Sequence, residues 1–147
     1  MIPDWLQLIL GVSAPVIAIF AAYIGYRQWQ LGAYKLKHDL YERRWAIYAA
    51  AHDAIATSVS GPNDERHSAF QKLRVRTLSA QFLFPQHICE YLDKLIEEIL
   101  RLNKLEIEIK KNNTSELRDE HKQLYAWLEL QPKVLVGMLK KYLDLSI

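Results

Sequence analysis

The side chains best suited to chemistry in this sequence are five histidines and a single cysteine. His87 and Glu90 stand at positions i and i+3, a spacing found in the carboxylate-bridged metal sites of helical bundles. Such sites require a second pair of this kind, and no other histidine has a glutamate three residues after it. Cys89 has no partner for an intrachain disulfide, and it is typical of a small hydrophobe buried on a helix. We therefore predict no metal site, no cofactor and no catalytic residue.

Other signatures of enzyme chemistry are missing from the sequence. The five glycines are dispersed and form no phosphate-binding loop, and no serine lies in a nucleophile elbow. Lys72, Arg74 and Arg76 form a basic patch, which is interpreted as a solvated helix face, with a binding site as the alternative. The formal charge of +2 is too small to indicate a nucleic-acid partner. The sequence predicts a non-enzymatic protein, and an enzyme with an unrecognised site is the remaining alternative.

These residues must be positioned by helices, because the apolar residues after position 33 recur with a helical period. The first helix is expected to end at the breaker Ser60-Gly61-Pro62-Asn63. Its predicted core face consists of Tyr41, Trp45, Tyr48, His52, Ile55 and Val59, and is widened by Leu36, Leu40 and Ile47. The next helix is expected over about residues 64–84, with Leu78 and Phe82 beside its core face.

Two more helices complete the predicted domain. The third is expected over about residues 85–111, and the last begins after the loop at residues 112–115. Pro132 is expected to kink the last helix or divide it in two. Short loops between helices of this length indicate an antiparallel bundle of about four helices.

The N-terminal part of the chain is different, because residues 5–26 include no Asp, Glu, Lys, Arg or His. A helix of 22 residues spans about 33 Å, enough for the hydrocarbon core of a membrane. Trp5 and Tyr26 stand at its two ends, as interfacial aromatic residues do. The main alternative, a cleaved signal peptide, lacks its basic start and its cleavage site, and a buried soluble helix would not be apolar all round. We predict a transmembrane anchor over residues 1–33 and a second domain over residues 34–147.

The orientation of this anchor follows from the charges beside it. Basic residues follow the apolar segment and none precedes it; they are Arg27, Lys35, Lys37, Arg43 and Arg44. The positive-inside rule then predicts a single-pass protein of the inner (cell) membrane, with its N-terminus outside and its C-terminal domain in the cytoplasm. The same residues can attract anionic lipid headgroups, although topology and solubility are the preferred explanation of Lys35 and Lys37.

Small residues recur along one side of the predicted anchor. They are Gly11, Ala14, Ala18, Ala21 and Gly25, at spacings of three and four residues. Small residues let two membrane helices approach closely, so this stripe is a candidate packing face for a second copy or another membrane protein. The alternative is chance, because alanine and glycine are common in membrane helices.

Three segments of the chain resemble a known group of proteins. Residues 35–48 read KLKHDLYERRWAIY, which is similar to KLxxDL[FY][DE]RR[FW]x[VI]Y, a pattern that small bacterial inner-membrane proteins carry soon after one N-terminal span. Residues 80–85, AQFLFP, and residues 142–145, YLDL, are similar to the middle and the end of that group. The group is mostly uncharacterised and often occurs in mobile or prophage-like settings. The resemblance implies a single span and a helical domain, and it supplies no catalytic residues.

Together these observations predict an all-α protein in which one transmembrane helix continues into a cytoplasmic helical bundle. Its expected partners are the lipid bilayer and either a second copy or another membrane protein. The first functional hypothesis is a membrane-anchored interaction or assembly module. The alternative is an oligomerising membrane effector, of the toxin or phage-defence type, that perturbs the bilayer.

Overall fold

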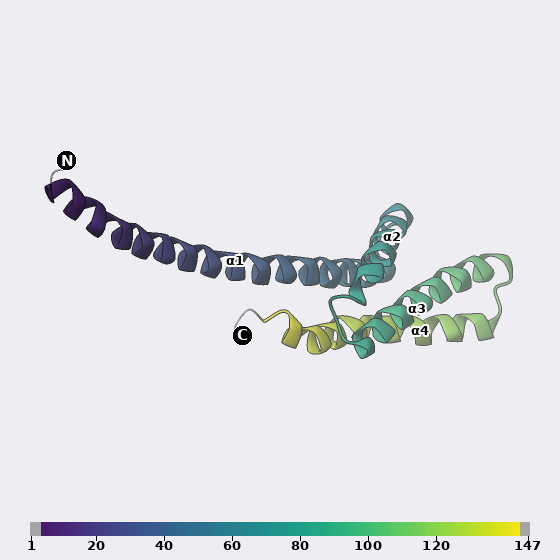
Figure 1. The fold of residues 1–147 in the computed structure, drawn as a ribbon. Coiled ribbons are helices and arrows are strands. Elements are labelled where there is room, and N and C mark those ends of the chain that lie inside the picture. Colours follow the sequence, from purple (N-terminus) through teal and green to yellow (C-terminus); the bar gives the residue numbers. More distant parts are fainter. Residues whose placement is uncertain (1–3, 145–147) are drawn as a thin grey trace. The chain divides into compact units, whose positions relative to one another are not determined.

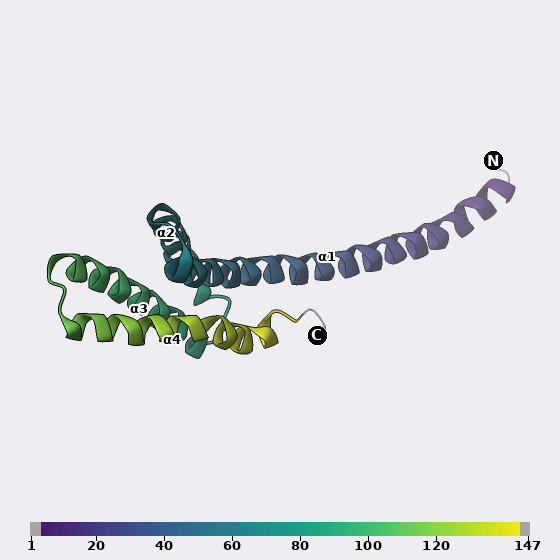
Figure 2. The ribbon, with the colours of Figure 1, turned by 180° about the vertical axis from the view of Figure 1, so that it is seen from behind.

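The computed structural model describes the backbone of residues 4–144 and the side chains of residues 15–144. Over this range the chain is helical and has no strand, which confirms the all-α prediction. The elements are α1 (Asp4–Ser60), α2 (Asn63–Ala80), α3 (Gln86–Lys111), α4 (Ser115–Leu139) and the 3-10 helix η1 (Lys140–Tyr142) (Figures 1 and 2).

The chain divides into two compact units, Met1–Asp39 and Leu40–Ile147. The sequence places this boundary at residue 33. In the first unit α1 is unbroken although it includes Pro15. All side chains from 15 to 29 are exposed in this chain. The local contacts of this unit include the rings of Tyr26 and Trp29, whose centroids lie 6.3 Å apart.

The predicted membrane span lies only partly within the described side chains. Its first part, residues 5–14, falls outside them, together with Gly11 and Ala14 of the small-residue stripe. Among the residues whose side chains are described, none of the helices has a stretch apolar and long enough to cross a membrane.

In the second unit, the predicted core face of α1 is right in part. The residues that α1 buries are Ile47, Ala51, Ala54, Ile55 and Ser58. Of the predicted face, Ile47 and Ile55 are buried, Tyr41, Tyr48 and Val59 are half-buried, and Trp45 and His52 are exposed. The buried alanines let neighbouring helices approach closely, so the larger rings lie nearer the surface. Successive rings from Tyr41 to His52 lie beside one another along the helix, with centroids 5.1 to 6.2 Å apart.

The second helix, α2, is shorter than predicted and is followed by a turn over residues 81–84. It packs against α3 and buries Ala69, Phe70, Leu73 and Ala80. Leu78 and Phe82, which the sequence places beside this core face, are instead exposed. Both lie on the side of the helical turn that faces away from the buried residues.

The last two helices, α3 and α4, run side by side in opposite directions and form the main part of the core (Figures 1 and 2). Every third or fourth residue of α3 is buried, as its apolar period predicts; these residues are Ile88, Leu92, Leu95, Ile99, Leu102 and Leu105. The predicted division of the last helix at Pro132 is wrong, because α4 continues through this residue, and the alternative of a kink there stays a prediction. Leu128 and Leu135 are fully buried on either side of the proline, and their packing holds the helix together there.

Candidate functional site

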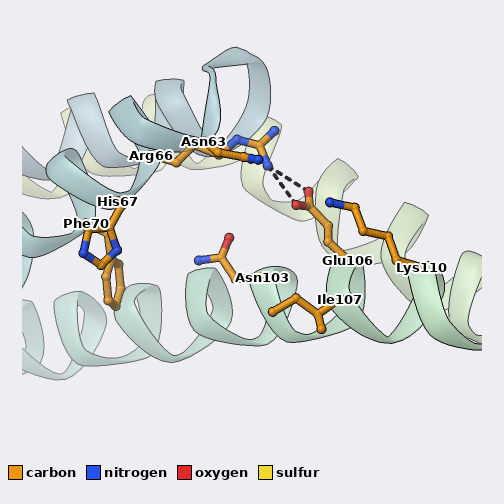
Figure 3. A pocket seen from close by; sticks show the side chains of 8 residues that line it. All are labelled: Asn63, Arg66, His67, Phe70, Asn103, Glu106, Ile107 and Lys110. Atoms are coloured by element: carbon orange, nitrogen blue, oxygen red, sulfur yellow. Dashed lines mark hydrogen bonds and ion pairs between the residues drawn. The ribbon is translucent and has the colours of Figure 1, made fainter.

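The beginning of α2 and the C-terminal half of α3 enclose a pocket of about 310 Å³ (Figure 3). Arg66 and Glu106 face one another across it, and Nη1 of Arg66 donates to both carboxylate oxygens at 2.9 Å. Nε of Arg66 also donates to the carbonyl oxygens of Thr57 at 3.1 Å and Gly61 at 2.9 Å. Arg66 therefore places a cation at the C-terminal end of α1, where the helix dipole favours it, and ties that end to α3.

The other polar groups near this pocket are also engaged in packing. Nε2 of His121, on α4, lies 3.7 Å from Oε1 of Glu106. The hydroxyl of Tyr125 donates to the carbonyl oxygen of Val59 at 2.8 Å, which satisfies another carbonyl at the end of α1. Because both oxygens of Glu106 accept hydrogen bonds from Arg66, the arrangement points to a structural rather than a catalytic use.

A second arginine, Arg44, joins α1 to two distant segments. Its Nε donates to the carbonyl oxygen of Leu83 and its Nη1 to that of Tyr142, both at 3.2 Å. Its guanidinium carbon also lies 5.9 Å from the ring centroid of Phe84. The ring of Phe84 meets that of Tyr142 edge to face, with centroids 5.8 Å apart. Arg44 thus clamps the turn after α2 and the end of the chain onto α1.

This clamp connects the three sequence segments that carry the resemblance. Arg44 belongs to residues 35–48, Leu83 and Phe84 to residues 80–85, and Tyr142 to residues 142–145. The structure brings one residue or more from each segment into direct contact. The motif around Arg44 therefore has a packing role in addition to the topology role expected for its charges.

Of the other basic residues named beside the predicted span, Arg27, Lys35, Lys37 and Arg43 are exposed on α1. In the small-residue stripe, the described members Ala18, Ala21 and Gly25 are exposed as well. A Cβ atom added to Gly25 would meet no atom within 4 Å in this chain. There is therefore room along this face for another helix to approach.

The His87–Glu90 spacing does not bring the two side chains into one cluster. Glu90 accepts a hydrogen bond from Gln86 at 2.8 Å, and the ring of His87 lies 6.4 Å from that of Tyr142. Cys89 is half-buried, and burial followed by the carboxylate of Asp93 raises the pKa of its thiol. A raised thiol pKa lowers the thiolate fraction at neutral pH, so Cys89 is a poor nucleophile.

A polar pair in the core was not anticipated from the sequence. The hydroxyl of Tyr91, on α3, lies 3.1 Å from Oε1 of Gln131, on α4, and donates to it. Nε2 of Gln131 donates in turn to the carbonyl oxygen of Trp127 at 3.0 Å. Burial raises the pKa of Tyr91 to about 12, so the hydroxyl stays protonated and keeps donating at neutral pH.

The surface of α2 that faces away from α3 offers a different environment. A groove of about 700 Å³ is lined by Trp45, Tyr48 and His52 of α1 and by Lys72 and Arg76 of α2. A second groove of about 390 Å³ is lined by six residues: Arg43, Ile47, Arg76, Ser79, Phe82 and Leu83. Within residues 15–144, Arg43, Lys72, Arg74 and Arg76 form no ion pair. The guanidinium carbon of Arg74 lies 6.0 Å from the ring centroid of Phe70. Unlike Arg44 and Arg66, which donate to backbone carbonyl oxygens of other segments, these four cations are exposed and can pair with a partner.

Comparison with known proteins adds nothing to this description. No protein-family model, curated protein or solved structure matches the chain.

Sequence reasoning missed the roles of Arg66 and Glu106. One signal was available for Arg66, because it follows the Gly61-Pro62 break closely and a cation is favoured near the end of the preceding helix.

Proposed function

We propose that this chain is a non-enzymatic interaction or assembly module, held at the bacterial inner membrane by one N-terminal helix. In this proposal the N-terminus lies outside and residues 34–147 lie in the cytoplasm. The observation that carries it is the contrast in the use of polar and apolar groups. Arg44, Arg66 and Gln131 hydrogen-bond to residues of other segments of the domain, whereas the large apolar side chains over residues 16–36 of α1 are exposed. So long an exposed apolar surface requires a bilayer or a partner helix to cover it.

The uncharged segment and the basic residues after it support the membrane part of the proposal. We expect the full-length protein to stay in the membrane pellet after alkaline carbonate extraction, and a chain shortened to begin at Ala33 to be released. A fluorescent protein fused to the C-terminus should fold and fluoresce, as it does in the cytoplasm. Release of the full-length chain by carbonate would reject the anchor.

The small-residue stripe supports self-association. We expect light scattering in mild detergent to give an oligomeric mass for the full-length protein and a monomeric mass for Ala18→Leu, because a larger side chain blocks close helix approach. Val16→Leu is the matched control, because two residues are just over half a helical turn and Val16 lies on the opposite side. Monomers in every sample would reject self-association and leave a different membrane protein as the partner.

The same stripe would serve an oligomerising effector, so the two functions need a separate measurement. An assembly module that does not perturb the bilayer should leave dye-loaded vesicles intact at protein densities where the oligomer forms. Dye release that Ala18→Leu abolishes and Val16→Leu does not would replace the assembly module by the effector. Growth arrest on expression, with the same dependence on the two variants, would give the same answer in cells.

A further inference from the structure

The exposed side of α2 and of the turn after it carries three large apolar residues. Val75, Leu78 and Phe82 are 64%, 72% and 82% exposed, respectively. Their spacing of three residues places Val75 and Leu78 in one strip on α2, on the side away from the buried Leu73, and Phe82 follows four residues later in the turn after α2. Burying these side chains in an apolar medium is favourable, and the residues that the structure describes leave them largely uncovered.

Basic residues border this apolar strip on both sides. At the helical period Arg74 lies along one margin of the strip, and Lys72 and Arg76 lie along the other. From residue 66 to residue 89 the sequence has no aspartate or glutamate. Asp93 lines a groove together with Arg74 and Leu78, and Asp53 lines a groove together with Lys72 and Arg76. The acids of α2 itself, Asp64 and Glu65, lie in its first turn. We call this combination of apolar strip and basic margins the outer face of α2.

A partner for this face must offer an apolar interior beneath a negatively charged surface. We infer that the outer face of α2 docks onto an anionic lipid bilayer, with Val75, Leu78 and Phe82 among the acyl chains and Lys72, Arg74 and Arg76 at the headgroups. Helices that lie in a membrane interface have this design, an apolar strip with lysine and arginine at its edges. The inference rests on the proposed anchorage, which keeps the domain next to a bilayer at high effective concentration.

A second copy of the chain is a poorer occupant of the same face. A two-fold symmetric contact would place the margins of one copy against those of the other, because each partner contributes the same patch. Lys72, Arg74 and Arg76 would then face their own counterparts, and the contact has no acidic residue between the two margins to offset them. Anionic lipid has the opposite charge and avoids this repulsion.

The test uses full-length protein reconstituted into vesicles and an environment-sensitive dye on the outer face. Gln71 is exposed one helical turn before Val75, so Gln71→Cys in a Cys89→Ala background places the dye in line with the strip and keeps all three apolar residues. We expect the emission to shift to the blue in vesicles that contain phosphatidylserine and not in pure phosphatidylcholine. Lipids carrying a spin label on the acyl chain should quench the shifted emission.

Charge and apolar variants then identify what holds the face to the bilayer. Arg74→Gln with Arg76→Gln should shift the docking equilibrium about thirtyfold toward the free state, at roughly a factor of five per cation. Leu78→Ser with Phe82→Ser should abolish lipid quenching. The controls remove matched groups elsewhere, Lys104→Gln with Lys133→Gln for charge and Leu130→Ser for apolar surface, and should leave the emission unchanged; all three of those positions are exposed.

Two outcomes with the reconstituted protein would overturn the inference, and a third leads to a further test. An unshifted emission in protein that resists carbonate extraction would show an intact anchor and an undocked face. A blue shift without lipid quenching would show that a protein surface, such as a second copy, covers the face. If carbonate releases the protein, the anchor itself fails, and the labelled protein is then added to preformed vesicles. In that arm a blue shift with lipid quenching that requires phosphatidylserine supports docking, and an emission that does not respond to phosphatidylserine rejects it.

Discussion

The helix α1 contains two stretches with opposite surroundings. Over residues 15–26 the side chains are predominantly apolar and all of them are exposed in this chain. Between residues 47 and 58 the helix is richer in alanine and polar residues, yet it buries a complete face. Burial in α1 therefore follows from the presence of neighbouring helices within the chain and not from how hydrophobic the segment is. In the proposed function, a lipid bilayer covers the exposed side chains of the first stretch.

The sharpest form of this comparison replaces a leucine by alanine in each unit. Leu95 is 0% exposed in α3, and Leu31 is 68% exposed in α1. We expect Leu95→Ala to lower the free energy of unfolding by about 2–5 kcal/mol, because it removes buried contacts and leaves a cavity. Leu31→Ala should leave it within about 0.5 kcal/mol of the parent. Urea unfolding of both variants in mild detergent, followed by near-UV circular dichroism, measures the difference, and equal losses would contradict it.

Arginines give the next largest contrast. Arg66→Met removes the donor shared by Thr57, Gly61 and Glu106, and it should cost about 2–3 kcal/mol of unfolding free energy because it leaves charged and backbone groups without that partner. The matched control is Arg27→Met in the first unit, where the side chain is exposed, and no change in domain unfolding is expected. Adding Glu106→Gln to Arg66→Met should cost little more, since the two residues act as a pair. A fully additive double variant would show that they do not.

The third contrast is the room for a side chain at one glycine in each unit. A Cβ atom on Gly61 would lie 2.8 Å from the carbonyl oxygen of Thr57, too close for a real contact. Gly61→Ala should therefore lower the thermal midpoint, at a cost of about 1–2 kcal/mol for the backbone shift it forces. Gly25→Ala meets nothing within 4 Å, and it should not destabilise the domain. Thermal melts followed by far-UV circular dichroism test the pair. An unchanged thermal midpoint for Gly61→Ala would mean that the backbone at the end of α1 shifts at little cost.

The smallest expected effect lies at the beginning of the second unit, in two adjacent arginines. Arg44→Lys keeps the charge but cannot reach the carbonyl oxygens of Leu83 and Tyr142 with one planar group, so we expect a loss of about 1 kcal/mol. Arg43→Lys is exposed and should be neutral. Hydrogen exchange adds a local readout, because Arg44→Lys should raise exchange in the turn at residues 81–84. Equal unfolding free energies and equal exchange at residues 81–84 in the two variants would show that Arg44 does not hold this turn onto α1.

The candidate surfaces show how far the sequence could be interpreted. Lys72, Arg74 and Arg76 were recognised as a basic patch, because their types and spacing are local properties. Their relation to Leu78 and Phe82 was not, because α2 offers apolar residues on two sides and its sequence does not say which side meets α3. The clamp of Arg44 was missed for a similar reason, since its acceptors lie 39 and 98 residues further along the chain.

From the sequence alone it follows that the chain is helical, that helices end at the breaks near residues 61 and 113, and that the apolar side of α3 faces a core. These features depend on interactions within a few residues, which follow directly from the order of side chains. The packing of the helices determines that α1 buries Ala51 and Ala54 while Trp45 stays exposed, and that α4 continues through Pro132. It also determines which arginines serve packing and which remain available. Such choices depend on contacts between distant segments, where shape and hydrogen-bond partners select among faces that the sequence makes equally apolar.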